Sequence, residues 1–106
     1  MRQGDVVLIE FPYSDLSESK RRPALVLSNK KYNAHHNCIL AGICGTKKPF
    51  SLPLSNADLT RKKLTKDSFV SLQNIFSADH SLIGKTVDSV SSEFLEKVLT
   101  EVGKCF

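Results

Sequence analysis

The chain has 106 residues, enough for one globular domain that folds without metal ions or disulfide bonds. Apolar residues make up 41% of the chain and charged residues 25%, with only 5 Gly and 4 Pro, which excludes a disordered or fibrous protein. The formal net charge of +4 permits a polyanionic partner without requiring one.

Targeting segments and metal motifs are not evident in the sequence. No apolar run is long enough for a signal peptide or a transmembrane helix, so we expect a soluble, cytoplasmic protein with no membrane partner. The three cysteines, Cys38, Cys44 and Cys105, form no C-x-x-C pair and have no histidine at the spacing of a zinc site. We therefore expect no metal and no cofactor, and we expect the cysteines to pack as small hydrophobic residues.

The N-terminal quarter of the chain joins two strand-like runs through a polar loop. Residues 6–11 and 24–27 are short, rich in β-branched residues and bounded by Gly, Pro and Ser, which predicts two strands of a small sheet. Residues 12–20, between them, are polar and predict a loop.

Three consecutive cations, Lys20, Arg21 and Arg22, precede the second predicted strand. Pro23 disfavours helix for the residue before it, so the Arg22 guanidinium projects from an extended backbone. Its planar fork suits phosphate oxygens. Other basic residues also lie in predicted loops beside strands: Lys30, Lys31, Lys47, Lys48, Arg61, Lys62 and Lys63. If these loops share one rim of the fold, that rim is cationic.

The middle of the chain predicts a central strand followed by a hairpin. Residues 29–37 are polar and predict a loop, whereas residues 38–44 are apolar throughout and predict a strand that is buried on both faces. Gly42 marks a bulge or bend in that strand. Residues 50–54 predict another strand, which Pro53 keeps short or places at an edge.

The C-terminal half predicts two more strands and a helix. Residues 67–72 and 82–90 are typical of strands, residues 73–78 of a short turn, and residues 56–59 of one helical turn. Ser92–Gly103 has the clearest helix signal, because serines can cap its start and apolar residues recur on one face. Several short strands with one terminal helix predict a small, barrel-like α+β domain.

Three motifs near the N-terminus occur in a recognisable order. Gly4 and Asp5 open the first strand, residues 11–16 read FPYSDL, and residues 20–28 read KRRPALVLS. In this order they resemble the PemK/MazF-like family of type II toxin ribonucleases, and a looser resemblance continues to the C-terminal helix. The resemblance implies an α+β, mainly β fold: a small SH3-like barrel of the CcdB/PemK-like toxin type with a C-terminal helix, in one domain spanning residues 1–106.

The resemblance also implies an activity. Related toxins are metal-independent endoribonucleases that cut single-stranded RNA, with messenger RNA the expected target, and leave 2′,3′-cyclic phosphate and 5′-OH ends. They use an arginine with a threonine or serine at the end of the central strand, which implies that Arg22 and Thr46 are catalytic here. Counting forward from Arg22 places the expected hydroxyl at Cys44 or Gly45, so Cys44 stays an alternative to Thr46.

Further candidates for RNA binding are polar, basic or aromatic residues of the matching segments: Tyr13, Ser14, Lys20, Arg21, Lys47, Gln73, Asn74 and Phe76. Gln73 and Phe76 stand where the family often has an acid and an arginine, a departure that bears on cleavage rate and sequence preference. Phe76 can stack an unpaired base or pack under the sheet. His35, His36 and His80 are weaker candidates for an acid or base role, because tandem histidines in a polar loop are usually exposed.

The expected partners follow from the same resemblance. They are an RNA substrate, a second copy in a homodimer, and a cognate antitoxin protein whose acidic, apolar tail would fill the cationic groove. Two alternatives stay open: a CcdB-like toxin that binds DNA gyrase without cutting RNA, and a degenerate toxin that retains only antitoxin binding. The Arg22 motif favours RNA cleavage.

Overall fold

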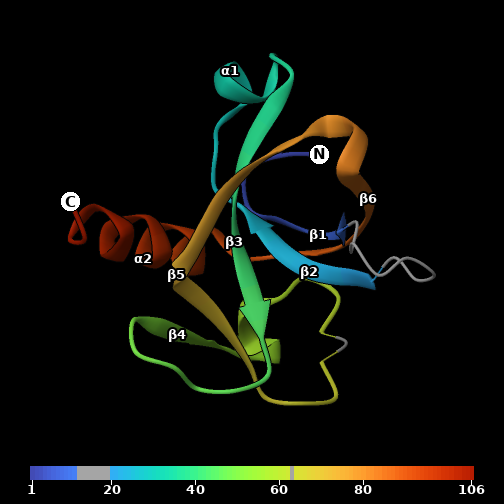
Figure 1. Ribbon diagram of the computed structural model, residues 1–106. Helices are drawn as coiled ribbons and strands as arrows, with labels where there is room; N and C mark the ends of the chain where they lie inside the picture. Colours follow the sequence, from blue (N-terminus) through green and yellow to red (C-terminus); the bar gives the residue numbers. More distant parts are fainter. Residues whose placement is uncertain (12–19, 63) are drawn as a thin grey trace.

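The computed structural model describes residues 1–11, 20–62 and 64–106. Its strands are β1 (Asp5–Phe11), β2 (Lys20–Val26), β3 (Asn37–Cys44), β4 (Ser51–Leu54), β5 (Ser68–Asp79) and β6 (Ile83–Ser89). Its helical segments are α1 (Lys30–Asn33), the 3-10 turns η1 (Asn56–Asp58) and η2 (His80–Leu82), and α2 (Ser92–Gly103). The strands form one antiparallel sheet in the order β4-β5-β3-β2-β1-β6 (Figure 1).

The segment after β4 links the two edges of this sheet. Once past η1, Leu59 forms an isolated antiparallel bridge with Val90, which directly follows β6. The backbone N–H of Thr60 donates to the carbonyl of Ser89 at 2.9 Å. The chain therefore passes from β4 at one edge to β6 at the other, and it brings the edges together as in a small barrel. The predicted mainly β fold with a C-terminal helix is confirmed.

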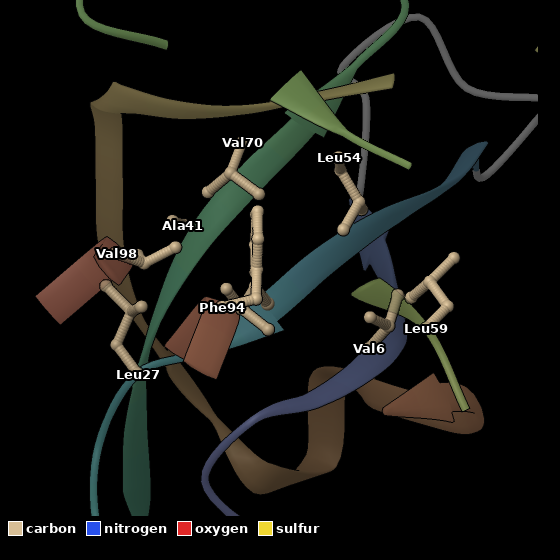
Figure 2. Packing of buried hydrophobic residues seen from close by; sticks show 9 residues of the cluster. Val6, Leu27, Ala41, Leu54, Leu59, Val70, Phe94 and Val98 are labelled. Atoms are coloured by element: carbon tan, nitrogen blue, oxygen red, sulfur yellow. The ribbon is translucent and has the colours of Figure 1, made fainter. Parts of the chain in front are cut away.

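Two apolar clusters lie on opposite faces of the sheet. The first is covered by α2, whose buried Phe94 and Val98 pack against Leu27, Ala41 and Val70 (Figure 2). The second has no helix in it and is formed by Val7, Ile9, Ala24, Val26, Cys38, Leu40 and Ala78. Because successive residues of a strand point to opposite faces, one strand serves both clusters.

Helix α2 occupies the predicted range. Ser91 caps its start, with its hydroxyl oxygen accepting the backbone N–H of Phe94 at 3.2 Å, and Glu93 lies near the positive end of the helix. Its buried side chains face the sheet, as the apolar stripe predicted. Among the described residues, no helix combines the length and the apolar character needed to cross a membrane.

Several local predictions are also confirmed. Residues 56–58 form the 3-10 turn η1, and β4, which contains Pro53, is an edge strand, where a missing N–H does little harm. Gly42 lies at a break in register between β3 and β5. A residue without a side chain at this break leaves room for the side chain of Asn74.

Three predictions need correction. Residues 73–78 are not a turn but part of β5, because β3 supplies pairing partners for residues 75–79, and Ile75 and Phe76 there favour a strand. The predicted loop at 29–37 contains the helical turn α1, which Asn29 caps by accepting the N–H of Tyr32 at 3.0 Å. Strand β2 begins at Lys20 rather than at residue 24, because β1 pairs with residues 20–25.

Candidate active site

Strands β2 and β3 diverge near the start of β2, and a groove opens between them. Among the described residues, the β2–β3 ladder begins only where Ala24 pairs with Gly42. Pro23 has no N–H with which to extend the ladder. Beyond Gly42, β3 continues along β5 instead, with Ile43 paired with Val70. The first residues of β2 and the end of β3 therefore splay apart (Figure 1).

The groove has a volume of about 420 Å³. Its lining residues are Arg22, Pro23, Gly42, Ile43, Cys44, Lys48, Ser71, Asn74 and Phe76. Within the part of the chain that the structure describes, the lining includes two cations, an amide, a thiol and an aromatic ring, and no acidic residue. This combination suits a ligand that carries both negative charge and flat, hydrogen-bonding rings.

Arg22 lies on the same face of the sheet as the second apolar cluster and lines the groove at the end of that face. It pairs with Ile9 of β1 and shares its face of β2 with Ala24, and both of these side chains are buried. Arg22 itself is exposed. Its neighbour Arg21 points to the opposite face, where it lies across from the exposed Glu10. The two adjacent arginines thus have different surroundings, and only Arg22 lines the groove.

An insertion in β5 forms the facing wall of the groove. Between the pairs Ala41–Ile75 and Ile43–Val70, β3 advances by two residues and β5 by five. The extra residues bend β5 at 71–74 and bring the side chain of Asn74 over Gly42. A Cβ atom on Gly42 would overlap the amide nitrogen of Asn74 and would lie 3.2 Å from its Cγ. The missing side chain of Gly42 therefore makes room for the Asn74 amide.

The end of β3 brings a thiol to the groove. Cys44 is a lining residue, and its Sγ donates to the backbone oxygen of Thr46 at 3.3 Å. Thr46 lies in the exposed turn that follows and is not among the lining residues. Ser51 closes this turn, because its hydroxyl donates to the carbonyl of Lys48 at 2.6 Å and accepts the Lys48 N–H at 3.2 Å. Lys48 lines the groove, whereas Lys47 does not.

Some of the other predicted site residues line the groove, and some do not. Asn74 and Phe76 line the groove, but Gln73 lines a second hollow beside Phe50 and Leu72. Only the backbone of Lys20 is described, as the first residue of β2. Tyr13 and Ser14, together with the predicted loop over residues 12–19, lie outside the described residues.

Basic residues occur at both ends of the sheet. Arg22 and Lys48 line the groove, whereas Lys30 and Lys31 belong to α1, which precedes the start of β3. The guanidinium of Arg61 donates to the carbonyl of Val87 at 3.2 Å, beside β6. Of the cations whose side chains the structure describes, Arg22 and Lys48 are the two that line the groove.

The histidines lie away from the groove. His36 directly precedes β3, and its carbonyl accepts the backbone N–H of His80 at 2.9 Å. The groove is at the other end of β3, which is about 23 Å long for its 8 residues. Near the histidines, the pKa of Asp79 is lowered, first because its carboxylate accepts hydrogen bonds from Ser81 and then because His36 and His80 are close to it. None of the three histidines lines the groove.

Comparison with known proteins agrees with this description of a small, mainly β protein. Residues 2–106 match the family model described as PemK-like, MazF-like toxin of type II toxin-antitoxin system. The chain therefore belongs to this toxin family. Comparison with curated protein sequences gives no significant match.

Solved structures have the same fold. An endoribonuclease in complex with its cognate antitoxin from a mycobacterial species has a TM-score of 0.77 and 20% identity, over 98% of this chain and 92% of that one. MazF from Deinococcus radiodurans has a TM-score of 0.75 and 24% identity, over 99% and 94%. The Mycobacterium tuberculosis toxin MazF-mt6 has a TM-score of 0.74 and 21% identity, over 96% and 95%. At these identities the likeness shows the fold.

Proposed function

We propose that this toxin is an endoribonuclease that cuts single-stranded RNA, including messenger RNA, in the groove between β2 and β5. The observation that carries the proposal is the presence of Arg22 and Lys48 beside Asn74 and Phe76 in one groove of a family member. Cations bind the phosphate backbone, while an amide and an aromatic ring contact unpaired bases. The bases of a duplex are already paired and stacked, so we expect the substrate to be single-stranded RNA.

The reaction uses a nucleophile that RNA itself carries. The 2′-oxygen attacks the adjacent phosphorus, the bond from phosphorus to the 5′-oxygen breaks, and the proton of the 2′-OH is released while the leaving oxygen gains one. The products are a 2′,3′-cyclic phosphate and a 5′-OH end. Such a catalyst has to align the attack and stabilise the charge that develops on the phosphate, so a metal ion is not required.

Arg22 is proposed to be the main catalytic residue. Its planar guanidinium can donate two parallel hydrogen bonds to phosphate oxygens and stabilise the additional negative charge. Proton donation by Arg22 to the leaving oxygen is harder, because a guanidinium holds its proton tightly. We therefore assign Arg22 to charge stabilisation.

The second position is assigned to Cys44 in preference to Thr46. Cys44 lines the groove together with Arg22, whereas the Thr46 side chain belongs to the turn beyond it. A thiol is a weak hydrogen-bond donor, and the Cys44 S–H has to leave the Thr46 carbonyl to contact RNA, so its part is to orient the phosphate or the 2′-oxygen rather than to stabilise much charge. Lys48 supplies further attraction for the RNA backbone.

The proposal includes two protein partners. The family consists of toxins of toxin-antitoxin systems, and one structural neighbour was solved with its cognate antitoxin. We propose that this chain also binds a cognate antitoxin, which blocks the groove, and that it forms a homodimer. Phe50 and Phe106, which are 67% and 96% exposed, supply apolar surface for association. Light scattering at micromolar concentration tests the dimer, and a strict monomer would contradict it.

The activity is tested by incubating the purified protein with mixed single-stranded RNA in excess chelator. We expect fragments with 5′-OH ends. Intact RNA at high protein concentration, with circular dichroism showing a folded protein, would overturn the proposal. In that case, capture of a topoisomerase subunit would favour the CcdB-like alternative.

A further inference from the structure

We propose that Asn74 selects the base next to the scissile phosphate and that Gly42 holds the Asn74 amide in position to do so. This inference rests on the proposed RNA cleavage and adds to it the residue that determines sequence preference. Asn74 is the specificity-determining residue, and Gly42 is a positioning residue that acts only through Asn74.

The first observation is the position of the Asn74 amide. The insertion in β5 brings this side chain over Gly42, in the space that a Cβ atom would otherwise fill. The amide makes no hydrogen bond to any of the described residues, and Asn74 is exposed to solvent in the groove. Its donor and its acceptor are therefore both available to a ligand, and the packing against Gly42 limits where they can lie.

The second observation is the arrangement of the groove walls. Asn74 and Phe76 are two residues apart on β5, so they point to the same face. Arg22 lies on β2, on the other wall. A nucleotide whose phosphate binds Arg22 would place its base toward β5, where Phe76, which is half-buried against the second apolar cluster, also lines the groove. Stacking accepts any base, whereas an amide pairs its donor and acceptor with a particular base edge.

The proposed role of Gly42 depends on its lack of a side chain and not on an unusual backbone conformation. Gly4 is the one glycine of this chain with a positive φ, so alanine at position 42 is not strained by its backbone angles. The contact that alanine would disturb is with the Asn74 amide. Gly42→Ala should therefore displace the amide and leave the rest of the groove in place. Gly103→Ala is the matched control, because nothing lies within 4 Å of a Cβ atom there.

The experiment is to cut a pool of single-stranded RNA of random sequence and to sequence the 5′ ends of the fragments. We expect the wild-type protein to prefer one base beside the cut by about tenfold, the discrimination that one good amide–base pair supplies. Asn74→Ala and Gly42→Ala should both lower this preference to about twofold or less. Gly103→Ala should keep it.

The double variant Gly42→Ala/Asn74→Ala separates positioning from a general structural effect. If Gly42 acts only through Asn74, the double variant has the base preference of Asn74→Ala alone. A further loss in the double variant would overturn the role of Gly42. An unchanged base preference in Asn74→Ala, with RNA still cut, would overturn the role of Asn74 and leave the proposed activity intact.

A binding measurement covers the case in which the wild-type protein cuts no RNA. Fluorescence anisotropy with four 2′-deoxy homopolymers reports base preference without cleavage. A wild-type preference that Asn74→Ala removes would support base selection, although the proposed activity has failed. Equal binding of the four homopolymers, or no binding, would overturn base selection as well.

Discussion

Arg22 of β2 pairs with Ile9 of β1, so a cation of the groove and a side chain that is only 1% exposed lie next to each other on one face of the sheet. The backbone of Arg22 is fixed on one side by this pairing and is followed by Pro23. A guanidinium that starts from a fixed backbone loses less freedom when it binds phosphate, which is what charge stabilisation in a transition state requires.

Replacement of Arg22 tests this role. Arg22→Ala should lower the cleavage rate on the order of a hundredfold or more, by analogy with the loss of one oxyanion donor. Arg22→Lys should restore little of the rate, because lysine keeps the charge but lacks the planar fork. Single-turnover rates at saturating protein measure the chemical step. Arg21→Ala, on the opposite face, should cause a smaller loss, and equal small losses in both variants would reduce Arg22 to a contributor of general attraction.

Cys44 and Thr46 can be distinguished in the same assay. Cys44→Ala should slow cleavage about tenfold or less, because the thiol that it removes is a weak hydrogen-bond donor. Cys44→Ser should be much closer to wild type, because a hydroxyl takes the place of the thiol. Thr46→Ala should have the smaller effect of the two alanine variants. The reverse order would return the second position to Thr46.

The stability of the fold depends on the contact between α2 and the sheet. Phe94 is 4% exposed and packs in the first apolar cluster (Figure 2). Phe94→Ala should lower the free energy of unfolding by about 3–5 kcal/mol, because it leaves a cavity in the core. Leu99 of the same helix is 37% exposed, and Leu99→Ala should lose about 1 kcal/mol or less. Urea unfolding of both variants measures these values, and equal losses would contradict the packing described.

Asp79 predicts a pH dependence of stability. Its pKa is lowered in the folded protein, chiefly by hydrogen bonds from Ser81 and less by His36 and His80. A carboxylate with a depressed pKa stabilises the fold above its unfolded pKa, near 4, and this contribution is lost as the pH falls through the folded pKa. Asp79→Asn should therefore be less stable than wild type at pH 7, and the difference should shrink below pH 4. Urea unfolding between pH 7 and pH 3 measures it, and a constant difference would contradict the assignment.

Much of the fold could be predicted from local pattern. The range of α2 follows from a capping serine and an apolar stripe, and the edge position of β4 follows from Pro53. The path of β5 could not be predicted, because residues 73–78 mix polar and apolar residues without a clear period and form a strand through pairing with β3. Pairing partners that are distant in the sequence leave no local signal.

The groove residues could be predicted only in part, because the groove also depends on contacts between distant parts of the chain. Arg22 stands out because it lies between a basic run and a proline, but the groove beside it depends on where β2 and β3 stop pairing. Lys48 rather than Lys47 lines the groove in a turn that hydrogen bonds between Ser51 and the Lys48 backbone hold. Asn74 rather than Gln73 lines it beside the insertion in β5. Each of these depends on tertiary structure. The basic pair at 47 and 48 pointed to Lys48, whereas for Gly42 the sequence indicated only a bulge or bend.

The most direct test of the central claim is a comparison of two RNA strands that differ by one oxygen atom. One is an RNA oligonucleotide that the protein cuts at a single position, and the other carries a 2′-deoxy sugar on the 5′ side of that bond. We predict that the first strand is cut to a 2′,3′-cyclic phosphate and a 5′-OH end and that the second stays intact while binding with similar affinity. Cleavage of the 2′-deoxy strand at the same bond and a similar rate would contradict attack by the 2′-oxygen.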